Sequence, residues 1–268
     1  ATVGPRIVAS GPPITVTKGH LWYFGGEADG VEGIRAAVRE HVARGVDVVK
    51  LVATGGTMTP TVGPHESQYS RDEIRAAVEE AHALGRPVAV HAHGADGIAD
   101  SLAAGADSIE HCTFFTADGV AADPSVVAQL AASDAAISMT AAVLPGVDTF
   151  KPAMRHRLAA IKETHAALHR SGARIVCSSD SGVTPNKPHD VLPYGVSDFL
   201  PAIGMTNAEA LTATTALAAE VCGLAEVTGT LTPGKDADIL AVPANPLTNL
   251  TTLHNPLAVW VRGRQVTT

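Results

Sequence analysis

Cysteine, long apolar runs and targeting signals are scarce or missing in this chain of 268 residues. The three cysteines, Cys112, Cys177 and Cys222, lie far apart and are odd in number, so they indicate neither a disulfide framework nor a CxxC site. No apolar stretch approaches the roughly 20 residues that a membrane-spanning helix needs. The start, ATVGPRIVASG, lacks the basic and apolar regions of a signal peptide. We therefore expect a cytoplasmic protein that makes no contact with membranes.

Positive charge is also in short supply. The chain has 19 Lys and Arg against 27 Asp and Glu, a formal net charge of −8. Phosphate recognition requires a basic surface, so this balance argues against a nucleic-acid partner. Hydrophobic residues make up 46% of the chain, which is enough for a well-buried core in one large domain or two small ones.

What the chain does contain is an alternation of short β-branched runs with amphipathic segments, a pattern typical of a parallel α/β sheet or barrel. We expect strands over 5–11, 46–56, 88–94, 106–112, 135–142 and 173–180, and helices over 30–45, 70–84, 95–105, 125–134, 153–171 and 206–224. Ser70, three residues before Glu73, predicts a capping box at the second helix. After residue 223 the chain becomes turn-rich with short alternating strands, which indicates a small appended β unit.

Four polar residues stand at the carboxyl ends of four different predicted strands: Lys50, His91, His111 and Asp180. Catalytic groups of parallel barrels occupy this position. A cationic Lys50 among Val and Leu is costly unless it is paired or modified. It could become a metal-bridging carbamate, pair with Asp180, or serve as a Schiff-base lysine with a depressed pKa. Imidazoles on two adjacent strands favour a metal site.

The ordered segments VDVVKLVATGG, SQYSRDEIRAAVEEAHALGRPVAVHAHG, AGADSIEH, SSDSG and GTLTPGKDADILAV resemble the amidohydrolase superfamily. The chain is most similar to the branch of imidazolonepropionase-like enzymes, zinc prolidases and Xaa-Arg carboxypeptidases. This resemblance implies an α/β fold, a (β/α)8 TIM-like barrel of which residues 1–223 supply strands 3–8 only. It also implies that residues 224–268 are the C-terminal strands of a small β-sandwich.

The resemblance also assigns roles to individual residues. Lys50 matches the lysine that carries a CO2-derived carbamate and bridges metals, His91 and His111 match metal ligands, and Asp180 matches the aspartate that binds metal and acts as general base and acid. The implied cofactor is zinc, as one or two divalent ions. We interpret four further residues as candidate substrate contacts: His93, His20, Tyr69 and His65.

One family signature is not found: the His-x-His pair of strand 1, since the only histidines before Lys50 are His20 and His41. An open six-stranded sheet would leave unpaired edges and apolar surface. We therefore expect a complementary N-terminal polypeptide, a homo-oligomer, or both as partners, beside a small-molecule or dipeptide substrate.

These observations predict a metal-dependent hydrolase that cleaves an amide, peptide, cyclic-amide or ester bond with a metal-activated hydroxide, in the manner of a prolidase or dipeptidase. One alternative is a catalytically impaired metal-binding or assembly fragment that needs the complementary chain. Another is a Schiff-base lyase that uses Lys50; it leaves His91 and His111 without a role.

Overall fold

The computed structural model describes residues 4–59, 61–147 and 155–266. These residues form two compact units, each treated by itself. The first, called here the histidine unit, comprises Val8–Ser138 and Ala153–Arg174. The second, called here the C-terminal unit, comprises Ala1–Ile7, Met139–Pro152 and Ile175–Thr268. The expected domain boundary at residue 223 follows a different division and stays a prediction.

The described parallel strands alternate with helices as the sequence predicts. Strands β1 (Val49–Val52), β2 (Val88–Gly94), β3 (Ser108–Phe115), β4 (Ala136–Met139) and β5 (Arg174–Cys177) follow one another in the sheet in chain order. Helix α1 (Gly30–Ala43) precedes β1, and the helices between successive strands are α2 (Arg71–Ala83), α3 (Ala95–Ala104), α4 (Pro124–Ala132) and α6 (Leu158–Arg170). Residues 153–154 of the helix expected over 153–171 lie outside the described part of the chain. Within that part the sheet does not close into a barrel, and the α/β class is confirmed.

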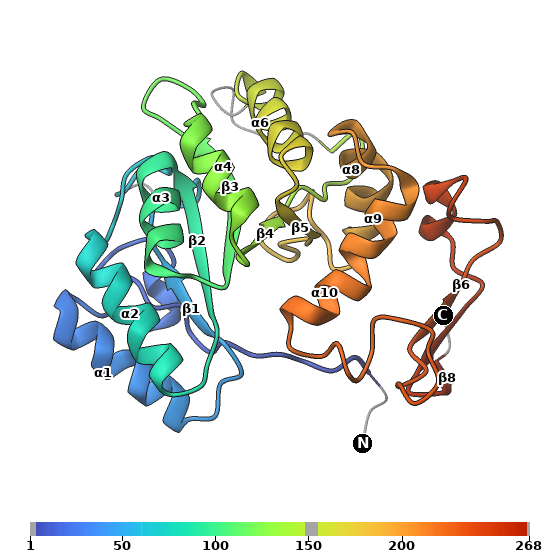
Figure 1. Ribbon diagram of the computed structural model, residues 1–268, viewed down its shortest axis with the longest axis horizontal. Coiled ribbons are helices and arrows are strands. Elements are labelled where there is room, and N and C mark those ends of the chain that lie inside the picture. The colour runs from blue at the N-terminus through green and yellow to red at the C-terminus, as the bar shows by residue number, and fades with distance from the viewer. Residues whose placement is uncertain (1–3, 60, 148–154, 267–268) are drawn as a thin grey trace. The chain divides into compact units, whose positions relative to one another are not determined.

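The two faces of the sheet in the histidine unit differ in character. Helices α1, α2 and α3 lie along one face of β1–β3 (Figure 1), where Leu51, Val90 and Ile109 are fully buried. Alternation along each strand places Lys50 and His91 on the opposite face, because Lys50 pairs with Ala89 and residues two apart point the same way. The apolar face therefore holds the helices, and the other face carries the polar groups.

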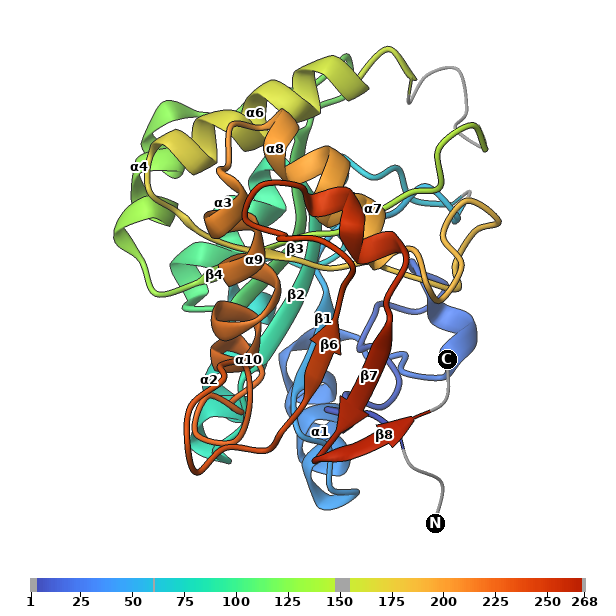
Figure 2. The same cartoon turned by 90° about the vertical axis from the view of Figure 1, so that its right-hand side faces the viewer.

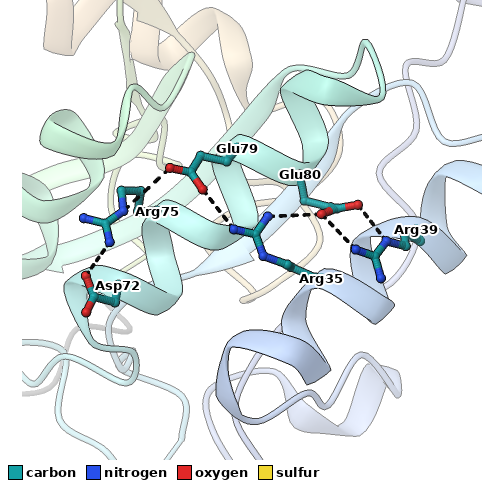
Figure 3. Close-up of polar contacts among 6 residues, drawn as sticks. All are labelled: Arg35, Arg39, Asp72, Arg75, Glu79 and Glu80. Atoms are coloured by element: carbon teal, nitrogen blue, oxygen red, sulfur yellow. Dashed lines mark hydrogen bonds and ion pairs between the residues drawn. The ribbon is translucent and has the colours of Figure 1, made fainter.

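Helices α1 and α2 are joined by a cluster of ion pairs (Figure 3). The Arg39 Nε lies 2.7 Å from Glu80 Oε1, and Arg35 reaches both Glu80 (3.1 Å) and Glu79 (2.9 Å). At the start of α2, Ser70 and Glu73 form the capping box that the sequence predicts. These contacts fix the helix pair that covers β1.

The strand expected over 5–11 is wrong. The chain instead forms isolated parallel bridges just after this range, between Ile14 and Leu51 and between Thr15 and Glu27. Gly11 adopts a left-handed conformation with φ 65°, and Pro12 and Pro13 follow it and lack the N–H that a ladder requires. Ile7 is 72% exposed, so its apolar run is not buried by a sheet.

The C-terminal unit contains the expected small β sheet. Strands β6 (Ile239–Ala241), β7 (Ala258–Val261) and β8 (Arg264–Val266) pair antiparallel in the order β6-β7-β8 (Figure 2). The unit also holds the short helices α7 (Leu192–Tyr194), α8 (Leu200–Ala202), α9 (Asn207–Thr214) and α10 (Ala216–Val221), a π-helical turn at Gly195–Phe199 and a 3-10 helix at Leu250–His254.

The single helix expected over 206–224 is interrupted. It ends at Thr214 and resumes at Ala216, because Thr215 leaves helical geometry with ψ −87°. The hydroxyls of Thr212, Thr214 and Thr215 each donate to the carbonyl four residues earlier, a contact that competes with the helical ladder and bends helices. Among the described residues, no helix combines the length and apolar character that a membrane crossing would need.

Candidate metal centre

His91 is the central residue of β2, and its imidazole is almost completely buried. Its Nε2 lies 3.1 Å from the carbonyl oxygen of Gly55. A carbonyl only accepts, so Nε2 carries the proton and Nδ1 keeps its lone pair. Burial, and then the positive charges of His93, His20 and Lys50, hold the pKa of His91 well below its usual value. The ring is therefore neutral and has one nitrogen available for a metal ion.

That available nitrogen faces His111. The Nε2 of His111 lies 2.9 Å from the Nδ1 of His91, and the two ring centroids are 4.6 Å apart. Regular alternation would not bring these rings together, because the register pairs His91 with Glu110 and Ala92 with His111. The left-handed φ of 71° at His111 breaks the alternation. A kink in β3 thus turns this imidazole toward the face that carries His91.

His93 joins the same group. Its ring stacks on His111 at 4.3 Å and on Phe115 at 5.2 Å between centroids. Thr113 Oγ1 donates to the His93 carbonyl, so it accepts from the His93 Nδ1–H at 2.9 Å, and Nε2 retains its lone pair. One ligand atom from each of His91, His93 and His111 lies within 4.8 Å of the others. His93 therefore stands among the groups able to hold a metal, besides its predicted contact with substrate.

Lys50 and His20 adjoin this group electrostatically. The charge of Lys50 lowers the pKa of both His91 and His20, and burial is the larger cause in each case. The pKa of His20 falls to about 4. Its Nδ1 lies 2.9 Å from Thr59 Oγ1, and its ring centroid lies 4.8 Å from that of His91. A side chain at Gly56 would collide with His20, since an added Cβ would lie 2.2 Å from its Nε2.

The two remaining loop candidates have different surroundings. The backbone of His65 packs against Gly94, where an added Cβ would lie 2.5 Å from the His65 carbonyl oxygen. The hydroxyl of Tyr69 donates to the Ala28 carbonyl at 2.7 Å, and burial raises the pKa of that hydroxyl. These contacts bind both residues to the scaffold of the histidine unit. Their contact with substrate stays a prediction.

Asp180 belongs to the C-terminal unit, just after β5. Its φ of 51° is left-handed, and its Oδ2 lies 3.5 Å from the Nζ of Lys187. The Lys187 ammonium also donates to the carbonyls of Thr140 at 2.5 Å and Ser179 at 3.1 Å. Burial lowers the pKa of Lys187 and the charge of Asp180 opposes that shift. Lys187 thereby restrains the loop that carries Asp180, a contact with no signal in the sequence.

The donor set of the histidine unit suits a divalent transition metal. Neutral imidazoles are good ligands for zinc, and a histidine ligand usually donates its other ring N–H to a carbonyl, as His91 does to Gly55. Cys112, beside His111, is buried, and burial raises the pKa of its thiol, which disfavours the reactive thiolate. Three clustered imidazoles on adjacent parallel strands of an α/β fold make this group a candidate metal site.

Comparison with known proteins identifies the family of the chain. The chain belongs to the amidohydrolase family, whose sequence model matches residues 1–266. It is 30% identical to ochratoxinase of Aspergillus niger, with 98% of this chain aligned to 60% of that protein. The chain therefore spans about three fifths of the length of that relative.

Solved structures agree with the family. A Xaa-Pro dipeptidase with methionine bound in its active site superposes with a TM-score of 0.82 at 26% identity, covering 100% of this chain and 69% of that one. A prolidase complexed with N-methylphosphonate-L-proline gives a TM-score of 0.82 at 26% identity, covering 98% and 69% of the two chains. The α/β architecture expected from the resemblance is confirmed by these structures.

Proposed function

We propose that the protein is a metal-dependent hydrolase of amide bonds, in peptides or cyclic amides, with esters as related substrates. The observation that carries the proposal is the facing pair of His91 Nδ1 and His111 Nε2, 2.9 Å apart, with the outer nitrogen of His91 tied to a carbonyl. Family membership supports the same chemistry. A Schiff-base lyase would give this imidazole pair no function.

Each residue of the site has a proposed task. His91 and His111 hold the metal through the two facing nitrogens, and His93 lies within reach as a further nitrogen donor. Lys50 contributes a carbamate oxygen once its amine has added CO2, and the carbamate replaces a cation beside buried imidazoles with an anion. When bound, a divalent ion such as zinc supplies a Lewis acid and lowers the pKa of a water molecule to about 7.

Proton movement falls to Asp180 in this proposal. Its carboxylate accepts a proton from the attacking water and returns it to the leaving nitrogen, the usual exchange of base and acid roles. Lys187, 3.5 Å from the Asp180 carboxylate, keeps that carboxylate oriented. The charge pair is partly exposed, so the orientation matters more than the strength of the attraction.

The substrate class rests on the relatives. Two solved structures similar to this chain are a Xaa-Pro dipeptidase and a prolidase. On the basis of these two relatives we propose dipeptides as substrates. We propose that His20 and His93, which adjoin His91, contact the bound dipeptide. Ochratoxinase, similar in sequence, is named for another kind of substrate, and this supports including other amides in the assay.

The proposal is tested by metal binding and hydrolysis together. The purified chain is loaded with Co²⁺ or Zn²⁺ and assayed against a panel of Xaa-Pro dipeptides and cyclic amides. His91→Ala and His111→Ala are expected to weaken metal binding by at least about 10-fold. The matched control is His82→Ala, since His82 lies on the surface of α2, paired with Asp107. Equal metal binding in all four proteins would refute the metal centre.

We further propose that a companion polypeptide completes the fold. In the C-terminal unit, β6 and β8 are the outer strands of their sheet, and Leu240 of β6 is 46% exposed beside a cavity of about 370 Å³. Outer strands with exposed apolar side chains are sites of strand addition. Intact-mass analysis and light scattering of the purified protein decide the point: a single species with the mass of one 268-residue chain would refute it.

A further inference from the structure

The backbone of β3 is strained where it presents His111. Three non-glycine residues in this strand have left-handed φ values: His111 at 71°, Cys112 at 49° and Phe114 at 53°. Such conformations cost roughly 1–3 kcal/mol each and persist only where the surroundings enforce them. The pairing with β2 shifts register here, since Ala92 pairs with His111 but Gly94 pairs with Phe115. Two extra residues of β3 therefore bulge out of the ladder.

The bulge adjoins a break in the pairing of β3 with β4. Within the described pairing, β3 and β4 are in register only from Ser108 to Glu110, so the ladder stops just before the bulge. A buried carbonyl without a donor costs about 1–3 kcal/mol. A side-chain donor from another element can therefore stabilise the part of β3 that carries the proposed metal ligand.

His165 supplies that donor. It lies on α6, is buried, and places its Nε2 3.0 Å from the His111 carbonyl oxygen and 3.2 Å from the Cys112 carbonyl oxygen. Two acceptors around one nitrogen require that Nε2 carries a proton, shared between the two carbonyls. The same peptide units set the φ of Cys112 and the direction of the His111 side chain.

We propose that His165 is a positioning residue for the metal centre: by holding the two carbonyls of the β3 bulge, it keeps the His111 imidazole facing His91. It acts through the backbone and touches neither metal nor substrate. The expected effect on metal affinity rests on the proposed function. The expected effect on the direction of the His111 side chain applies to the metal-free protein as well.

The apolar face of α6 would serve packing equally well with leucine at position 165, which lies one helical turn after Ile161 and before Leu168. A purely structural residue there should therefore be replaceable by an apolar one. A positioning residue should not, and an amide donor of similar reach should replace it. This contrast defines the variants His165→Met and His165→Gln.

The first experiment uses metal-free protein and long-range ¹H–¹⁵N NMR of the histidine rings. In the wild type, His165 is expected as the Nε2–H tautomer, and the His111–His91 hydrogen bond is expected to be visible. His165→Gln should retain that bond and His165→Met should lose it. The matched control is His41→Met, since His41 is also a buried helical histidine, with its Nε2 2.8 Å from the Pro12 carbonyl oxygen. It should leave the His111–His91 bond intact.

The second experiment measures Co²⁺ affinity and the visible spectrum of the Co²⁺ protein. His165→Met should weaken binding by about 10- to 100-fold and alter the spectrum, the usual size of an outer-shell effect. His165→Gln should recover affinity to within about threefold, and His41→Met should match the wild type even where it lowers stability. A loss of affinity that is equal in His165→Met and His41→Met would overturn the inference.

The two experiments separate failure of the inference from failure of the proposed function. If the wild type binds no Co²⁺ while the His111–His91 bond still depends on His165, the proposed function fails and the positioning role stands. If the wild type binds Co²⁺ and His165→Met changes neither the His111–His91 bond nor the Co²⁺ affinity, the positioning role fails and the proposed function stands. If His165→Met does not fold, the wild-type spectrum decides, because a His165 with its proton on Nδ1 has no donor for the two carbonyls.

Discussion

The ion-pair cluster between α1 and α2 allows a quantitative prediction about stability (Figure 3). Glu80 accepts two hydrogen bonds from Arg39, at 2.7 and 3.1 Å, and one from Arg35, at 3.1 Å. Its side chain is only 13% exposed, whereas that of Glu79 is 52% exposed. Exposed pairs contribute about 0.2–1 kcal/mol each. The bidentate geometry and the low exposure of Glu80 place its contribution near the upper end of this range. Glu80→Gln should therefore lower the free energy of unfolding by about 1 kcal/mol.

The assay is urea unfolding of wild type, Glu80→Gln and the control Glu79→Gln at pH 7 in low and high salt. Glu79→Gln should cost at most about 0.5 kcal/mol, because Arg35 is its close partner at 2.9 Å and Arg75 lies 3.7 Å away. Added salt should shrink both effects. If Glu79→Gln lowered the free energy of unfolding as much as Glu80→Gln, then low exposure and bidentate geometry would not determine the size of the loss.

The contribution of Glu80 to the free energy of unfolding should depend on pH in a definite direction. The hydrogen bond from Arg39 holds the pKa of Glu80 below its usual value of 4.5. A carboxyl with a depressed folded-state pKa stabilises the fold above the unfolded pKa and loses that contribution as pH falls through the folded pKa. The difference between wild type and Glu80→Gln should therefore be constant from pH 7 to about pH 5 and shrink below pH 4.5. A difference that grew in acid would refute the reasoning.

Three further predictions concern the site and its scaffold. Gly97→Ala should cost about 1–3 kcal/mol of unfolding free energy in thermal or urea melts, because its Cβ would lie 2.3 Å from Thr54 Cγ2; an unchanged melting curve would contradict this close packing. Asp180→Asn should keep its metal content nearly normal while turnover falls by at least about 100-fold, and equal turnover would remove the general-base role. Wild-type stability should fall as pH drops from 6.5 toward 4, since the pKa of His20 is lowered to about 4 and the unfolded chain binds more protons in that window. His20→Asn should flatten this dependence in urea titrations at several pH values, and an unchanged slope would mean that another group is responsible.

Some of the site could be predicted from the sequence because its signals are local. The capping box of Ser70 and Glu73 depends on spacing alone, and the strand around Val90 depends on a β-branched run ended by glycine. The strand expected over 5–11 failed because two prolines and Gly11 outweigh its apolar residues. The helix expected over 206–224 failed because threonine hydroxyls compete for its carbonyls.

The sequence by itself determined the class of the fold and the presence of imidazoles on two neighbouring strands, since periodicity and spacing along one chain are enough for both. Strand β3 runs further than expected, and His91 and His111 lie within their strands and not at the ends. The tertiary structure alone decided that His111 turns toward His91, because strict alternation along β3 would send it to the other face. It also decided that His165, 54 residues further along the chain, holds that turn, for nothing in the helix around it distinguishes a packed histidine from a donor to a distant strand.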